Sequence, residues 1–320
     1  MSAAIPELPT QPAARRSRHD WGALWFLLPN IAGFLLFTLL PVLAACLLSF
    51  TRWDAVESWQ GIHFVGLQNY RQILGATHET GAWRPNDDQF WYYMYNTLYL
   101  MVGIPIGMAL SFFTALLMNQ KLRGITFYRV VFFLPTVCSS VAVAMVWRWV
   151  YDADWGLLNQ SLHLAGIANT PGWLINPSWA KPALILMGLW MGIGGYNCVL
   201  YLAGLQGIPE ELYEAANLDG AGWWDKVKHI TWPMLAPTTF FILVMAIISG
   251  FQGHFVSIHI LTQGGPAGST TNLLYYIYQS AFDHQKMGYA CALAMILFAL
   301  IFVVTLLNWK YGKKTQDIYG

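Results

Sequence analysis

The chain consists of long apolar segments separated by polar ones. A helix that crosses a membrane needs about 20 mainly apolar residues. Six segments meet this requirement and are predicted to be transmembrane helices: Leu24–Phe50, Tyr95–Met118, Val130–Tyr151, Pro182–Leu205, Thr238–Thr262 and Tyr289–Trp309. The pattern predicts an all-α polytopic membrane protein whose transmembrane domain covers residues 22–315.

The first 21 residues do not share this pattern. They are rich in Pro and Ala and contain Arg15, Arg16 and Arg18. The segment Leu24–Phe50 that follows is too long and too far from the N-terminus for a cleaved signal sequence, and no A-x-A site follows it. We therefore expect residues 1–21 to be a disordered tail and Leu24–Phe50 to remain as the first span.

The composition agrees with a membrane protein. Hydrophobic residues make up 56% of the chain and charged residues only 10%, whereas soluble domains contain about 25% charged residues. The net charge of +1 gives no reason to expect a nucleic-acid partner. The four cysteines fall inside apolar runs without paired spacing, so we expect small buried apolar side chains and no metal site.

The distribution of Lys and Arg predicts the orientation of the chain. Cytoplasmic loops of membrane proteins carry an excess of these residues. With the N-terminus in the cytoplasm, 11 of the 17 Lys and Arg residues fall on the cytoplasmic side. Both termini are therefore expected in the cytoplasm, together with the loop between the fourth and fifth spans.

That loop, Ile208–Pro237, is strongly polar. It contains seven charged residues, and one charge at the centre of a membrane costs about 2.5–3.5 kcal/mol. We predict two short helices, Pro209–Leu218 and Gly222–Thr231, the second ending before Pro233. Gly220 is expected to end the first helix in the left-handed conformation. Leu212, Ala215 and Ala216 would share one flat side that fits a partner's groove.

The loop also resembles a known motif. Glu214-Ala215-Ala216, with Asp219-Gly220 and Pro233 beyond, resembles the EAA signature of the membrane subunits of bacterial ABC importers. In that family the loop forms the coupling helix that docks on a cytoplasmic ATPase. The resemblance implies that these six residues couple the chain to the ATPase. Glu214 would anchor the helix by a polar contact, the two alanines would allow close docking, and Gly220 would form the turn.

Other stretches resemble carbohydrate-type permeases, similar to those of maltose and glycerol-3-phosphate importers. They occur in the family's order at Phe64–Tyr70 (FVGLQNY), Phe127–Pro135, Trp147–Asn159 and Leu261–Phe282 (LTQGGP at its start). The aromatic and acidic stretch Trp83–Tyr95 has two interpretations: an interfacial aromatic belt, or part of a docking face for an extracytoplasmic binding protein.

Polar groups within the fourth and fifth spans suggest a substrate path, because such groups tend to face a cavity or another helix. Aromatic faces and neutral hydrogen-bonding groups together suit a sugar. By resemblance to maltose-type permeases, Gly192, Tyr196, Phe251 and His254 correspond to the sugar site. The alternative is that the glycines pack helices and that Tyr196 and Asn197 bond across a helix interface. The full candidate set is Trp190, Gly192, Tyr196, Asn197, Phe251, Gln252 and His254.

The chain contains no nucleotide-binding motif. We expect no cofactor in this chain, with ATP and Mg²⁺ on a partner ATPase. The resemblance implies a cytoplasmic ATPase dimer, an extracytoplasmic solute-binding protein and a second homologous permease subunit. A heterodimer is preferred, although the sequence leaves a homodimer open. Membrane lipid is the remaining expected partner.

The expected substrate is a sugar or oligosaccharide. No Lys or Arg lies near the middle of a span, which favours a neutral solute. Import of glycerol 3-phosphate or a related polyol phosphate remains an alternative, because the second subunit would be able to supply a cation. An ion-coupled secondary transporter is less favoured, since no span holds a central carboxylate and no inverted repeat is evident. Motifs of an intramembrane enzyme do not occur.

Overall fold

The computed structural model describes residues 21–56, 61–79, 82–120 and 123–319. The chain divides into two units, Met1–Leu47 and Leu48–Gly320. The predicted disordered tail lies, except for its last residue, outside the described residues.

The first unit holds an apolar helical segment, as predicted for the first span. It comprises α1 (Trp21–Phe34), a π-helical turn η1 (Leu35–Leu39) and the beginning of α2 (Leu40–Leu48). The most apolar 18-residue window within residues 25–48 has a mean hydropathy of 2.6, and none of it is buried within the chain. The π turn ends two residues before Pro41, which lacks the N–H that a regular helix uses.

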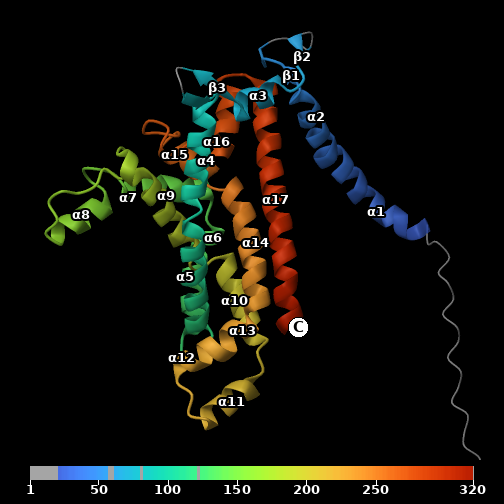
Figure 1. Ribbon diagram of the computed structural model, residues 1–320. Coiled ribbons are helices and arrows are strands. Elements are labelled where there is room, and N and C mark those ends of the chain that lie inside the picture. The colour runs from blue at the N-terminus through green and yellow to red at the C-terminus, as the bar shows by residue number, and fades with distance from the viewer. Residues whose placement is uncertain (1–20, 57–60, 80–81, 121–122, 320) are drawn as a thin grey trace, which may run out of the picture. The chain divides into compact units, whose positions relative to one another are not determined.

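The second unit has its strands and its polar loop at opposite ends (Figure 1). One end carries the antiparallel pair β1 (Thr51–Arg52) and β2 (His63–Phe64), the short helix α3 (Gln68–Leu74), and the hairpin of β3 (Ala76–Glu79) and β4 (Ala82–Pro85). The other end carries α11 (Glu210–Leu218), α12 (Trp223–Lys226) and α13 (Trp232–Met234). Long helices connect the two ends.

Two of the predicted spans of this unit are helical, and the apolar helical segments extend beyond the predicted bounds. The second consists of α4 (Asp88–Leu100) and α5 (Gly103–Met118), which together form an apolar segment of 31 residues. Asp87 caps α4 by accepting the N–H of Phe90 at 3.0 Å. The last is α17 (Met287–Tyr319), whose apolar part covers Met287–Lys310.

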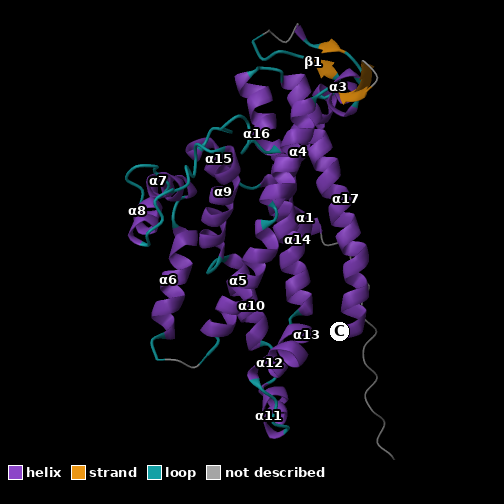
Figure 2. Cartoon of the chain, turned by 60° about the vertical axis from the view of Figure 1, so that its left-hand side comes forward, coloured by secondary structure: helices purple, strands orange, loops and turns teal. Residues whose placement is uncertain are grey.

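The third predicted span, Val130–Tyr151, is not one helix. It is divided into α6 (Ile125–Val137) and α7 (Ser140–Val150), which meet at 98°; Figure 2 shows them as separate helices. Pro135 removes a helical N–H near the end of α6, and Cys138 is extended (φ −72°, ψ 147°). Cys138 is exposed, so the expectation that all cysteines are buried is wrong at this residue.

The fourth and fifth predicted spans are also interrupted. The fourth is α9 (Pro177–Gly192) followed by α10 (Tyr196–Gln206), with a bend of 40°. The fifth is α14 (Ala236–Gln252) followed by α15 (Phe255–Leu261). Gly253 is extended and His254 left-handed (φ 65°) at this second break. The Asn272 side chain holds the break by donating to the Gly253 carbonyl at 3.0 Å.

The described part of the chain therefore contains four helices long and apolar enough to cross a membrane, or six if each bent pair is one span. Helix α5 packs against α9 and α10, and α14 packs against α17. The remaining short helices are α8 (Leu157–Leu164), α16 (Leu273–Tyr278) and the π turn η4 (Gln279–Asp283). Three apolar clusters of buried side chains hold these elements together.

Candidate functional site

The EAA segment forms helix α11 (Glu210–Leu218), between α10 and α14 in the chain. Pro209 is the N-cap (φ −57°, ψ 131°), not the first helical residue as predicted. Glu210 and Glu211 occupy the first turn, where the helix dipole favours negative charge. The sequence thus defines the start of this helix to within one residue.

Gly220 ends α11 in the predicted left-handed conformation, with φ +76°. The N–H of Ala221 donates to the carbonyl of Ala216 at 2.9 Å, and that of Gly220 donates to the carbonyl of Asn217 at 3.1 Å. These two bonds make a Schellman cap. A Cβ atom at Gly220 would meet nothing within 4 Å, so the backbone conformation alone requires glycine here.

The second predicted helix extends past its predicted end. It comprises α12 (Trp223–Lys226), the π turn η3 (Val227–Thr231) and α13 (Trp232–Met234), and so passes through Pro233. The N–H of Trp232 donates to the carbonyl of Val227, five residues earlier. This wide turn precedes Pro233 just as η1 precedes Pro41, and it lets the helix accommodate a residue without an N–H.

One side of α11 is attached to the rest of the unit and the other is exposed. The Tyr213 hydroxyl lies 2.9 Å from the Thr231 hydroxyl, and the Lys226 ammonium donates to the Asn217 side chain. Glu214 and Ala215 are exposed, Leu218 is 90% exposed, and Ala216 is half-buried. Of the six predicted coupling residues, Glu214, Ala215, Ala216, Asp219 and Gly220 lie together on α11 and its cap, whereas Pro233 lies in α13.

A second candidate site is a cavity of about 360 Å³ between the helices. Its walls come from the junction of α4 and α5, from α9 and α10, and from α14. Four predicted path residues line it: Gly192, Tyr196, Asn197 and His254. The left-handed backbone at His254 interrupts the helix at the cavity wall.

Three predicted path residues do not line this cavity. Trp190 packs edge-on against Trp147, with the ring centres 5.6 Å apart. Phe251 is 3% exposed and belongs to an apolar cluster that includes residues of α16 and α17. Gln252 faces an apolar groove formed with α16 and α17. All three are close in sequence to lining residues, but their side chains point to other sides of the helices.

Sequence reasoning missed the contribution of α5 to the cavity. Gly103 and Gly107 face α9, where a Cβ atom at each would meet Ile185 at 3.2 Å and Leu189 at 3.4 Å respectively. Glycines four residues apart lie on one side of a helix and permit close packing. The four-residue spacing of these two glycines was the feature of the sequence that indicated close packing at this side of α5. Gly194 at the α9–α10 bend is also required, since a Cβ atom there would lie 2.1 Å from the Phe132 carbonyl oxygen.

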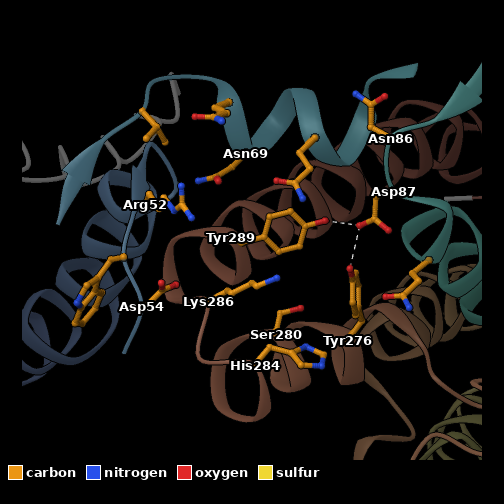
Figure 3. A pocket seen from close by; sticks show the side chains of 15 residues that line it. Arg52, Asp54, Asn69, Asn86, Asp87, Tyr276, Ser280, His284, Lys286 and Tyr289 are labelled. Carbon is orange, nitrogen blue, oxygen red and sulfur yellow. Dashed lines mark hydrogen bonds between the residues drawn. The ribbon is translucent and has the colours of Figure 1, made fainter. Parts of the chain in front are cut away.

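A third site lies at the strand-bearing end of the unit and holds a pocket of about 590 Å³ (Figure 3). Buried Asp87 makes hydrogen bonds there that connect the start of α4 with α16 and α17. Besides capping α4, its carboxylate accepts the Tyr276 hydroxyl at 2.9 Å and the Tyr289 hydroxyl. Burial raises the pKa of Tyr276 above its ordinary value, and the negative charge of Asp87 acts in the same direction. Tyr276 therefore remains a hydrogen-bond donor at neutral pH.

The FVGLQNY stretch supports this pocket. Its Asn69 donates to the carbonyls of Ser49 and Thr51, each at 2.9 Å, and Tyr70 donates to the Ser49 hydroxyl at 2.7 Å. These bonds fix α3 beside β1. The stretch therefore has a structural role at this end of the unit, a role that the motif alone did not indicate.

Residues 103–312 match the family described as the binding-protein-dependent transport system inner membrane component. The chain belongs to this family. It is thus an integral inner-membrane permease of an ABC transporter that works with a binding protein.

Curated relatives resemble the permease over most of their length. The probable ABC transporter permease protein YesP of Bacillus subtilis is 35% identical over 289 residues, covering 89% of this chain and 88% of YesP. The lactose transport system permease protein LacF of Rhizobium radiobacter is 31% identical, covering 96% and 99%. The trehalose/maltose transport system permease protein MalF of Thermococcus litoralis is 31% identical, covering 91% and 93%.

A solved structure shares the fold of the permease. A chain of a bacterial ABC transporter involved in the import of the acidic polysaccharide alginate matches with a TM-score of 0.78 at 24% identity, covering 92% of this chain and 96% of that chain. The relatives are permease subunits, which are transport components and not enzymes. ATP hydrolysis belongs to a separate subunit of such transporters.

Proposed function

We propose that this permease is one of two transmembrane subunits of an importer that carries a neutral sugar or oligosaccharide. A binding protein delivers the substrate to the extracytoplasmic face, and an ATPase dimer drives transport from the cytoplasm. The observation that carries the proposal is α11, an exposed, capped helix at one end of the unit. Its free side combines a carboxylate, a small residue and an exposed leucine, which suits docking into a groove.

The charges favour placing α11 in the cytoplasm. Helix α17 runs from the strand-bearing end to the end that carries α11 (Figure 1). Arg123, Arg129, Lys226, Lys228 and Lys310 follow or precede spans on the α11 side. Cytoplasmic ends of spans carry this excess of positive charge. The C-terminus then lies in the cytoplasm, and an even number of spans places the N-terminus there as well.

The cavity supports a neutral substrate. Among the described residues that line it, none is Lys, Arg, Asp or Glu. Tyr196, Asn197, Ser249 and His254 supply neutral hydrogen-bonding groups, and a volume of about 360 Å³ is in the range of ligand sites. LacF, MalF and the arabinooligosaccharides transport system permease protein AraP of Bacillus subtilis are named for sugars. A phosphate would meet no cation here, which disfavours glycerol 3-phosphate.

The cavity is formed by one chain, and a second homologous permease, preferably a distinct sister subunit, would complete the path. ATP and Mg²⁺ bind the ATPase dimer, and this chain holds no cofactor.

Closure of the ATPase dimer moves α11. Through the Tyr213–Thr231 contact it also moves the segment that leads into α14. Because His254 lies at the break that follows the far end of α14, this movement reaches the cavity. Glu214 anchors α11 on the ATPase, and Ala215 and Ala216 allow close approach.

Affinity purification of the tagged permease from its native membrane tests the proposed assembly. The complex is expected to contain one copy of a second six-span permease and two copies of a nucleotide-binding ATPase for each copy of this chain. A chain that purifies alone and transports a sugar on a proton or sodium gradient would refute the proposal.

A further inference from the structure

The pocket at the strand-bearing end contains two kinds of polar side chain (Figure 3). Side chains of the first kind are hydrogen-bonded to other residues of the chain: Asp87 accepts from two tyrosine hydroxyls, and Asn69 donates to two backbone carbonyls. The second kind makes no hydrogen bond or ion pair with another residue in the described part of the chain. It includes Arg52, Asp54 and Lys286, together with Gln68 and Gln72 of α3.

These uncommitted groups converge from three elements. Arg52 is the last residue of β1 and Asp54 lies two residues beyond it, the two glutamines lie on α3, and Lys286 immediately precedes α17. The backbones of Asp54 and Lys286 pair in an isolated β-bridge, which keeps the two segments adjacent. Figure 3 shows Arg52, Asp54 and Lys286 near one another, with Tyr289 between them and Asp87. The internally bonded residues hold this arrangement in place.

We propose that this pocket is an extracytoplasmic saccharide-binding site, separate from the cavity between the helices. The inference rests on the proposed function, because it assigns a second site to the same class of substrate. The pocket would hold one end of a sugar or oligosaccharide on the outer face of the permease. Its volume of about 590 Å³ accommodates a ligand of that size.

The mixture of donors and acceptors selects this class of ligand. Arg52 and Lys286 only donate, Asp54 only accepts when ionised, and the glutamines do both. Each sugar hydroxyl also donates and accepts, so a polyol satisfies all of them together. A simple anion would leave Asp54 facing negative charge, and a metal cation would face Arg52 and Lys286. The lining is too polar for a lipid chain, since Val65 is its single aliphatic side chain among the described residues.

The test measures sugar binding to the intact transporter complex in lipid nanodiscs, without binding protein and without ATP. The probes are radiolabelled lactose, maltotriose, raffinose and arabinotriose, each used in equilibrium dialysis, with sodium phosphate as competitor. The pocket variants are Arg52→Gln and Asp54→Asn. Matched controls are Arg123→Gln and Asp154→Asn, which change the same residue types on exposed segments outside the pocket.

The sugar that the complex transports is expected to bind, and each pocket variant is expected to weaken its binding about tenfold. The two controls are expected to leave this binding unchanged. Binding that is unchanged in the Arg52→Gln, Asp54→Asn double variant would overturn the inference and leave the proposed function intact. Displacement by phosphate but not by unlabelled sugar would also overturn it. A complex that transports none of the sugars contradicts the proposed function, and the inference with it.

Discussion

The imidazole of His254 lies against the backbone of Gly188. A Cβ atom at Gly188 would come 3.3 Å from the Cε1 atom of the His254 ring. A side chain at residue 188 would therefore press on the ring that faces the cavity. A left-handed backbone is unusual for a residue other than glycine, and such residues cluster at functional sites. The contact joins α9 to the break between α14 and α15, and both elements form the cavity wall.

If the cavity between the helices lies on the substrate path, a side chain that fills it should reduce transport. A Cβ atom at Gly192 would meet nothing within 4 Å, and leucine is a better helix former than glycine. Gly192→Leu should therefore fold normally and reduce sugar uptake at least about tenfold. Uptake into liposomes and thermal unfolding measure the two effects. Val199→Leu, on the exposed side of α10, is the control. Normal uptake by Gly192→Leu would exclude the cavity from the path.

The left-handed cap of α11 predicts a contrast between two substitutions. Gly220→Val places a β-branched residue at φ +76°, which costs about 1–2 kcal/mol, and should loosen the end of α11 and uncouple ATP hydrolysis from uptake. Gly220→Asn should retain most coupling because asparagine tolerates this conformation. The ratio of ATP hydrolysed to sugar imported is the measurement. Equal coupling in both variants would show that the cap does not transmit movement.

The exposed side of α11 predicts a loss of assembly without loss of stability. Leu218 is 90% exposed and Leu164, in α8, is 91% exposed. Leu218→Asp should weaken co-purification of the ATPase, since it places a charge in the proposed interface. Leu164→Asp should not. Neither substitution removes buried contacts, so both variants should unfold at the wild-type temperature. Retained ATPase in Leu218→Asp would place the docking surface elsewhere.

The buried Asp87–Tyr276 hydrogen bond predicts a dependence of stability on pH. The pKa of Tyr276 is raised above 10.0 in the folded state, mainly by burial. The stabilisation is complete below this ordinary value and is lost as pH rises through the folded-state pKa, because the unfolded chain releases its proton first. Tyr276→Phe should cost about 0.5–1.5 kcal/mol at neutral pH.

Thermal unfolding from about pH 8 to about pH 11 tests this dependence. The difference in unfolding temperature between wild type and Tyr276→Phe should shrink at the alkaline end. Tyr278→Phe, also in α16 but without a hydrogen bond to Asp87, serves as the matched control. A difference that stays constant with pH would contradict the role assigned to the Tyr276 hydroxyl.

The sequence predicted helical segments better than their interruptions. Apolar length located the first, second and last spans, because burial in a membrane requires it. The break at His254 depends on a long-range contact, the bond from Asn272 to the Gly253 carbonyl, which no local pattern encodes. The break at Cys138 follows Pro135, which removes a helical N–H near the end of α6. Pro233 was wrongly expected to end a helix, because a preceding π turn compensates for its missing N–H.

The candidate sites were predictable to different degrees. The cap at Gly220 follows from local backbone chemistry and was predicted correctly. Of the path residues, Gly192, Tyr196, Asn197 and His254 share a cavity, but Phe251 and Gln252 are turned away from it. The spacing of residues along a helix predicts which of them share a side of that helix. It does not predict which other helix packs against that side. The outer pocket was missed because Arg52, Asp87 and Lys286 come together from distant parts of the chain.

The most direct test of the central claim is the ATPase activity of the purified complex in liposomes, measured with and without its binding protein across a panel of neutral sugars and glycerol 3-phosphate. We predict that one neutral sugar together with the binding protein stimulates hydrolysis, and that Gly220→Val abolishes the accompanying uptake. Stimulation by glycerol 3-phosphate alone would contradict the neutral substrate. Sugar uptake that requires an ion gradient and no ATPase would contradict the whole account.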